Sequence, residues 1–241
     1  MPNRAAIITG ASRGIGYAIA DELGALGYQL TLSARKPERL AEAAAELAAK
    51  GYEVHHQAAN LSDEEALIAL VAAHRERYGR LDVLVNNGGV GIGAGAGEHQ
   101  TKFIDMQLDV NVRAMVILYR ECLPLLQQAG AEHGGALVVN LASIAGVSPQ
   151  PWLSVYSATK AAMIAYTTSM NKELAASGVK SVALCPGWVD TDMTDFMRST
   201  VDRQEMIQPS DIAAAVRFVL GLSKAVVIPE IVFQRPSETL F

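Results

Sequence analysis

The sequence predicts an α/β fold in which a doubly wound parallel sheet of seven strands carries helices on both faces. Short apolar runs alternate with longer segments of helical character along the chain, which is the pattern of a parallel sheet with crossover helices. The first apolar run also breaks into a glycine-rich turn before a helix. Because half of the 241 residues are apolar, the chain can bury a substantial core, and we expect one domain over residues 1–241.

Each expected strand is a short run dominated by aliphatic residues. The first, from Ala5 to Thr9, fits a strand buried on both faces of a parallel sheet. Ligands of such sheets bind beyond the carboxyl ends of the strands. Asn86, Ser143 and Pro186 lie at or just past such ends, as Thr9 does. The seven expected strands are residues 5–9, 29–33, 53–58, 82–86, 136–141, 181–185 and 225–228.

The segments between these runs have the features of helices. Ser62 and Glu65 form a capping-box pattern at the start of one of them. The segment from Val155 to Ala176 is rich in Ala, Met, Leu and Lys, lacks Pro and Gly, and stops at Gly178. The expected helices follow the glycine turn, then span residues 37–50, 62 to about 78, about 101–128 and 155–176, and the last follows residue 209.

The glycine turn is the first candidate binding site. Gly10, Gly14 and Gly16 have the spacing G-x-x-x-G-x-G, which departs from the G-x-G-x-x-G dinucleotide fingerprint. Glycines let the backbone approach a pyrophosphate closely, and the N–H groups at the start of the following helix favour an anion. The turn therefore indicates a dinucleotide site.

Tyr156 and Lys160 are a candidate proton-transfer pair. They stand four residues apart on an expected helix, so their side chains leave the same face, and Ser143 precedes Tyr156 by thirteen residues. A free tyrosine keeps its proton until about pH 10, but a nearby positive charge lowers the pKa of the phenol. Taken singly, such a pair is more often a half-buried aromatic residue and a solvated surface lysine, because pairs with this spacing are common on helices.

Several motifs in order decide between these alternatives, since together they resemble the short-chain dehydrogenase/reductase family, in its 3-oxoacyl reductase-like branch. The resemblance covers about residues 5 to 228 and implies a Rossmann-type sheet. The matching segments are residues 9–16 for the cofactor turn, 86–89 for the Asn-Asn-Ala-Gly motif, Asn111, Ser143, Tyr156 and Lys160 for the catalytic tetrad, and Pro186-Gly187 with Thr191 for the motif after the sixth strand.

The resemblance implies a role for each member of the tetrad. Tyr156 gives its proton to a substrate carbonyl oxygen, and Ser143 bonds that oxygen. Lys160 bonds the nicotinamide ribose, Asn111 holds a water that links Lys160 to solvent, and Thr191 bonds the carboxamide. The residues expected to contact the cofactor are Gly10, Ser12, Arg13, Gly14, Ile15, Gly16, Arg35, Asn60, Leu61, Asn87, Gly88, Tyr156, Lys160, Pro186, Gly187, Val189 and Thr191.

The end of the second strand favours NADP(H) over NAD(H). A carboxylate there bonds the ribose 2′-hydroxyl, whereas arginine accommodates a 2′-phosphate. The chain has Arg35 and no carboxylate at this end, and Arg13 lies within the glycine turn. Two guanidinium groups suit one phosphate, although Arg35 could also be a solvated loop residue. Asn60 stands where the family usually has aspartate, so we expect weaker contact with the adenine.

The substrate is less well defined by the sequence. Residues 88–97 include six glycines, which offer an uncluttered approach to the nicotinamide. Aromatic and sulfur side chains near the expected pocket indicate an apolar or aromatic carbonyl compound or its alcohol, although they could instead belong to the core or to a subunit contact. These residues are Trp152, Trp188, Met193, Phe196 and Met197.

Two other functions remain open. Many relatives are 3-oxoacyl-carrier-protein reductases, but residues 125–133 contain no Lys or Arg to attract an acidic carrier. A catalytically silent NADP(H)-binding sensor or scaffold is the alternative of another class, and loss of Tyr156 or Lys160 would indicate it. Both residues are present.

Composition limits the partners. The net charge of −5 and the scattered basic residues argue against nucleic acid, and no apolar run is long enough for a membrane span. Cys122 and Cys185 lack metal-ligand spacing, so we expect no metal site and a cytoplasmic enzyme. The resemblance implies a homodimer or homotetramer formed through two long helices. The apolar residues of these helices are equally compatible with subunit contact and with packing on the sheet; they are Met106, Val110, Met115, Leu118, Met163, Tyr166 and Met170.

Overall fold

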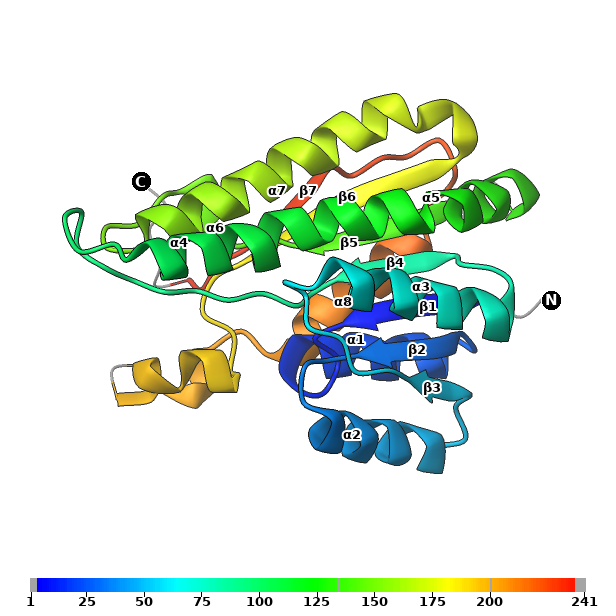
Figure 1. The fold of residues 1–241 in the computed structure, drawn as a ribbon, viewed down its shortest axis with the longest axis horizontal. Coiled ribbons are helices and arrows are strands. Elements are labelled where there is room, and N and C mark those ends of the chain that lie inside the picture. Colours follow the sequence, from blue (N-terminus) through cyan, green and yellow to red (C-terminus); the bar gives the residue numbers. More distant parts are fainter. Residues whose placement is uncertain (1–3, 134, 200, 237–241) are drawn as a thin grey trace.

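The computed structural model describes residues 4–133, 135–199 and 201–236, with the side chains of residue 133 and residues 196–199 outside the description. Seven strands form one parallel sheet in the order β3-β2-β1-β4-β5-β6-β7, which confirms the predicted fold class (Figure 1). The strands are β1 (Ala5–Thr9), β2 (Gln29–Ser33), β3 (Val54–His56), β4 (Val83–Asn86), β5 (Ala136–Leu141), β6 (Val179–Pro186) and β7 (Glu230–Phe233).

Helices cover both faces of this sheet (Figure 1). The α-helices are α1 (Gly14–Ala25), α2 (Pro37–Ala49), α3 (Glu64–Tyr78), α4 (Thr101–Leu108), α5 (Ala114–His133), α6 (Ile144–Val147), α7 (Ser154–Glu173) and α8 (Pro209–Leu220). A π-helical turn, η1 (Asp109–Arg113), joins α4 to α5, and short 3₁₀ turns are η2 (Ala175–Ser177), η3 (Asp192–Ser199) and η4 (Arg203–Glu205).

The central strand β1 divides the core in two. Its side chains alternate between the faces of the sheet, as they do in any strand. Ile7 packs in a cluster with residues of α3, α5 and α7, whereas Ala6 and Ile8 pack in a cluster with residues of α1, α2 and α8. All three are fully buried, so β1 is anchored from both sides and holds the glycine turn that follows it in place.

The last strand begins later than the sequence predicts. The expected strand at residues 225–228 lies outside the sheet, with Val226 40% and Val227 48% exposed. The ladder with β6 begins at Glu230, directly after Pro229, whose carbonyl oxygen accepts a bond from Ala183 N. A proline has no N–H to continue a ladder, so the apolar run before it does not pair.

Two helices also differ from prediction. Asp63 caps α3 by accepting from Ala66 N at 3.3 Å, so the cap lies one residue after Ser62. The helix expected over residues 101–128 is divided by η1, whose π-helical geometry inserts one residue into the helical register around Asn111. Such insertions are frequent at functional sites.

The residues proposed for subunit contact divide between core and surface. Three of them, Met115, Leu118 and Met163, are at most 2% exposed and pack in the core between the sheet and the helices α5 and α7, so they are not available for a subunit contact. Met106 is 38% exposed. Among the described residues, no helix has both the length and the apolar character that a membrane crossing requires.

Candidate active site

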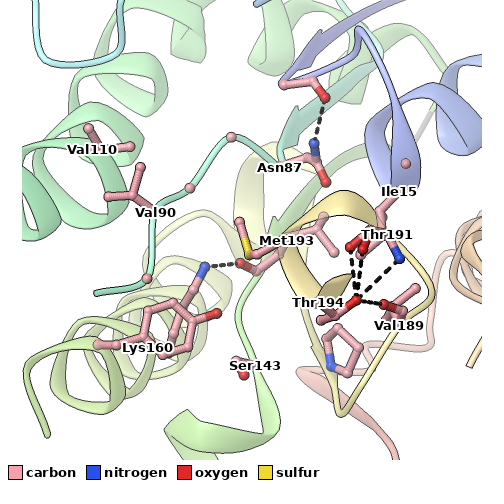
Figure 2. Close-up of a pocket in the computed structure, with 18 of the residues that line it drawn as sticks. Ile15, Asn87, Val90, Val110, Ser143, Lys160, Val189, Thr191, Met193 and Thr194 are labelled. Atoms are coloured by element: carbon pink, nitrogen blue, oxygen red, sulfur yellow. Dashed lines mark hydrogen bonds between the residues drawn. The ribbon is translucent and has the colours of Figure 1, made fainter. Parts of the chain in front are cut away.

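A cavity of about 860 Å³ lies at the carboxyl ends of β1, β2, β4, β5 and β6. Most of the site residues predicted from the sequence border it, among them Asn87, Ser143, Lys160 and Thr191 (Figure 2). The predicted residues that line the cavity are Gly10, Ser12, Arg13, Gly14, Ile15, Arg35, Asn60, Leu61, Asn87, Gly88, Ser143, Trp152, Tyr156, Lys160, Pro186, Gly187, Trp188, Val189, Thr191 and Met193. Gly16 and Asn111 do not line the cavity, and the side chains of Phe196 and Met197 fall outside the described residues.

The glycine turn depends on the absence of side chains. Gly10 and Gly14 have φ values of +63° and +56°, in the left-handed region that favours glycine. Gly16 supports the turn from behind, because a Cβ there would lie 2.4 Å from the Gly10 carbonyl oxygen. The turn therefore presents bare backbone to the cavity.

The end of β4 fixes this turn. Asn87 Nδ2 donates to the carbonyl oxygens of Thr9 and Gly10 at 3.0 and 3.1 Å. The Thr9 hydroxyl accepts from the backbone N–H groups of Asn87 and Gly88, both at 3.1 Å, and donates to Val85 O. The Thr9 contacts were missed at the sequence level because they depend on the pairing of β1 with β4.

One end of the cavity is basic. Arg13, Arg35, Lys36 and Arg39 all line it. Arg13 forms an ion pair with Asp192, and Arg39 Nη1 lies 3.9 Å from the same carboxylate. Arg39 and Asp192 were missed, since nothing in the sequence indicates that α2 and η3 approach the glycine turn. The residues directly after β2, Ala34, Arg35 and Lys36, include no carboxylate and all line the cavity.

Tyr156 and Ser143 meet at the opposite end. Ser143 caps the short helix α6, its hydroxyl accepting from Ala145 N at 3.2 Å. Burial raises the pKa of the Tyr156 phenol above its ordinary value, while a hydrogen bond with Ser143 lowers it. The phenol is therefore an acid that keeps its proton at neutral pH, next to a hydroxyl that can bond the same substrate atom.

Lys160 lies close to Tyr156 and is buried, with 4% of its surface exposed. Its Nζ is 5.6 Å from the centre of the Tyr156 ring and donates to Leu141 O at 2.6 Å (Figure 2). Burial lowers the pKa of Lys160 to about 8. The expectation that Lys160 lowers the pKa of Tyr156 is not met here, because the amine bonds the Leu141 carbonyl and burial of the phenol prevails.

Asn111 is bonded to the loop that follows β4. Its Oδ1 accepts from Val90 N at 2.9 Å, and its Nδ2 donates to Val90 O and to the Thr159 hydroxyl. A Cβ on Gly89 would lie 3.3 Å from Asn111 Oδ1 and 3.5 Å from Lys160 Nζ, so the two side chains approach each other across Gly89. Asn111 thus braces the loop that covers Lys160.

The remaining wall near Tyr156 combines apolar side chains with the neutral polar residues Ser148 and Gln150. Trp152 and Met193 are 52% and 56% exposed, and Leu153 and Ile144 complete this side. The last two were missed because isolated aliphatic residues carry no local signal. Thr194 was also missed; its hydroxyl accepts from Thr191 N at 3.2 Å and so fixes the turn after β6.

Comparison with known proteins agrees with this geometry. A family model described as short chain dehydrogenase matches residues 4–202. An uncharacterized oxidoreductase of Staphylococcus epidermidis is 32% identical over 228 residues, covering 95% of each chain. The structure of an alcohol dehydrogenase from the archaeon Thermococcus sibiricus, complexed with 5-hydroxy-NADP, is 31% identical with a TM-score of 0.87 and covers 98% of this chain and 99% of that one.

A second solved structure is similar to the same extent. A variant of the actinorhodin polyketide ketoreductase with NADPH is 30% identical, with a TM-score of 0.87, over 96% of this chain and 95% of that one. The family model covers β1 to β6, the glycine turn and the tyrosine helix, and the relative and the structures cover 95% or more of this chain. The chain therefore belongs to the short-chain dehydrogenase family.

Proposed function

We propose that this enzyme transfers a hydride between NADP(H) and a carbonyl compound or its secondary alcohol, with Tyr156 as the acid and base. One observation carries the proposal: the glycine turn and the group formed by Tyr156, Ser143 and Lys160 border the same cavity. A dinucleotide bound at the turn and a carbonyl oxygen bound at the phenol can therefore meet inside it.

The cavity fits a phosphorylated dinucleotide. Gly10 and Gly14 line the cavity without side chains, and a Cβ would lie 2.7 Å from Asn87 Nδ2 at the first and 3.1 Å from Thr191 Cγ2 at the second. The tight turn therefore keeps its backbone at the cavity wall, which suits a pyrophosphate. Arg13 and Arg35 would hold a 2′-phosphate, and Arg39 adds a third guanidinium at this end. The two solved structures described above contain NADPH or an NADP derivative, which supports the same choice.

The protein groups perform the proton chemistry. When bound, NADPH supplies the hydride that reduces the carbonyl carbon. Tyr156 donates its proton to the carbonyl oxygen as negative charge develops there, and Ser143 stabilises that charge through a hydrogen bond. Lys160 would exchange its bond to Leu141 O for one to the nicotinamide ribose, and its ammonium would then favour the phenolate that Tyr156 becomes. In alcohol oxidation the same groups act in reverse.

The substrate is a neutral, apolar carbonyl compound. The apolar part of the wall near Tyr156 consists of Trp152, Leu153, Ile144 and Met193, and Ser148 and Gln150 add two neutral polar side chains. No charged residue between Ser143 and Tyr156 lines the cavity. An apolar wall gains from burying an apolar group, whereas a charged head group there would lose its water without a partner. We propose that these side chains contact substrate and that the enzyme acts as a homodimer or homotetramer.

A panel of ketones and secondary alcohols tests this function. We expect reduction of apolar ketones with NADPH, followed at the nicotinamide absorbance, with much lower kcat/KM for ketoacids of the same size. Preference for a ketoacyl group on an acidic carrier protein over the free ketone would favour carrier-protein reduction instead. Tight NADPH binding without turnover of any compound would favour the silent sensor.

A further inference from the structure

Trp152 has an unusual backbone conformation. Its φ of 56° lies in the left-handed region, and it is the one residue other than glycine with a positive φ in the part of the chain that the structure describes. A bulky residue in this region is strained, and strained residues persist where their surroundings hold them, often at functional sites. The Trp152 carbonyl oxygen accepts from Ala94 N at 2.8 Å, so the loop after β4 holds it.

The indole of Trp152 rests directly on Gly93 of that loop. A Cβ on Gly93 would lie 1.9 Å from Trp152 Cε3 and 2.2 Å from Cζ3, which is far shorter than van der Waals contact. Two residues earlier, a Cβ on Gly91 would lie 3.2 Å from Cδ2 of the Tyr156 ring. The same short loop therefore lies against both aromatic rings, and at Gly93 only glycine leaves room.

Two buried amides hold the loop from its other side. Gln107 and Asn111 stand four residues apart on α4 and η1, and both are 1% exposed. Gln107 Oε1 accepts from Ile92 N at 3.1 Å, while Asn111 bonds both backbone groups of Val90. Alternate residues of the loop are thus bonded to Gln107 and Asn111 and packed against the rings, so the bonded loop holds its glycines against Trp152 and Tyr156.

We propose that Trp152 is a specificity-determining residue whose clamped indole stacks on a flat aromatic ring attached to the substrate carbonyl. This inference rests on the proposed function and names its substrate class, the aryl ketones. The indole is half exposed, lines the cavity and stands four residues before Tyr156 on the same segment. A fixed aromatic face favours a planar ring over a puckered one because offset stacking needs two flat surfaces.

Acetophenone and cyclohexyl methyl ketone provide the test, since they share one carbon skeleton and differ in the flatness of the ring. We define the ring ratio as kcat/KM for acetophenone divided by kcat/KM for the cyclohexyl ketone; comparing it between variants cancels the difference in intrinsic reactivity. Trp152→Ala should lower the ring ratio by roughly three- to tenfold, mainly through KM for acetophenone, while KM for NADPH stays unchanged.

Gly93→Ala tests the clamp with the indole still present. The added Cβ must displace the ring, so the ring ratio should fall as in Trp152→Ala. Gly97→Ala is the matched control, because no atom lies within 4 Å of its added Cβ and the ring ratio should stay at the wild-type value. In the double variant Gly93→Ala/Trp152→Ala, the glycine change should lower the ring ratio no further.

The outcomes separate this inference from the function on which it rests. A wild-type ring ratio in both Trp152→Ala and Gly93→Ala would overturn the stacking role while leaving the oxidoreductase proposal intact. An equal fall in Gly97→Ala would also overturn it, because the effect would then come from loop rigidity. Failure of the wild-type enzyme to reduce either ketone, or any other in the panel, would overturn the proposed function and this inference together.

Discussion

Tyr156→Phe is expected to lower kcat for ketone reduction by about a thousandfold, within the range that a positioned acid contributes. The substitution removes only the phenol oxygen and leaves a ring of the same size against Gly91. NADPH affinity should remain largely intact, because the arginines and the glycine turn at the other end of the cavity are untouched. Steady-state kinetics and an NADPH titration on the same preparation measure both quantities.

Tyr166→Phe is the matched control for this loss. Tyr166 lies on the same helix, packs edge to face on Tyr119 with ring centroids 5.1 Å apart, and does not line the cavity. We expect its kcat to equal that of the wild type. Because burial raises the pKa of Tyr156, the phenol keeps its proton around neutrality, while kcat for alcohol oxidation, which needs the phenolate, should rise with pH. A Tyr156→Phe enzyme with normal kcat would refute the mechanism.

The second large effect concerns cofactor choice. We expect the wild type to prefer NADPH, and Arg13→Ala and Arg35→Ala each to lower kcat/KM for NADPH by roughly ten- to a hundredfold, the usual cost of a lost charge-assisted bond. The kcat/KM for NADH should change little, since NADH has no 2′-phosphate for the guanidinium to bond. The double variant should therefore lose most of the preference.

Two further variants make this result specific. Arg35→Lys keeps the charge but loses the planar fork, so it should recover only part of the NADPH preference. Arg77→Ala removes an exposed arginine of α3 that does not line the cavity, and it should leave both cofactors unaffected. A wild type that clearly prefers NADH would refute the assignment of Arg13 and Arg35.

The sequence predicts most of the fold because the strands of this sheet carry a strong local signal. The run from Ala5 to Thr9 is apolar at nearly every position, and the structure buries all of it. The last strand was misplaced because the apolar run at residues 225–228 has the same local appearance as a strand, and only pairing with β6 identifies Glu230 as the start. The π-turn at Asn111 likewise has no local signature.

The residues of the candidate site also include some that short motifs predict and others that only tertiary packing brings together. Gly10, Tyr156 and Lys160 belong to short motifs with fixed spacing, so the sequence is enough to propose them. Arg39 lies far along the chain from Asp192, and the bond from Ile92 N to Gln107 depends on how α4 packs beside the loop after β4. Distances of this kind follow from tertiary structure, which single motifs do not encode.

Transfer of deuterium tests the central claim most directly. NADPH carrying deuterium at both C4 positions is incubated with the enzyme and a ketone that it reduces, and the alcohol is examined by mass spectrometry and NMR. Direct hydride transfer predicts one deuterium on the carbinol carbon of every product molecule and none on its neighbours, with no alcohol formed by Tyr156→Phe above about a thousandth of the wild-type rate. Alcohol without deuterium on that carbon, or tightly bound NADPH with no alcohol from any ketone, would contradict it.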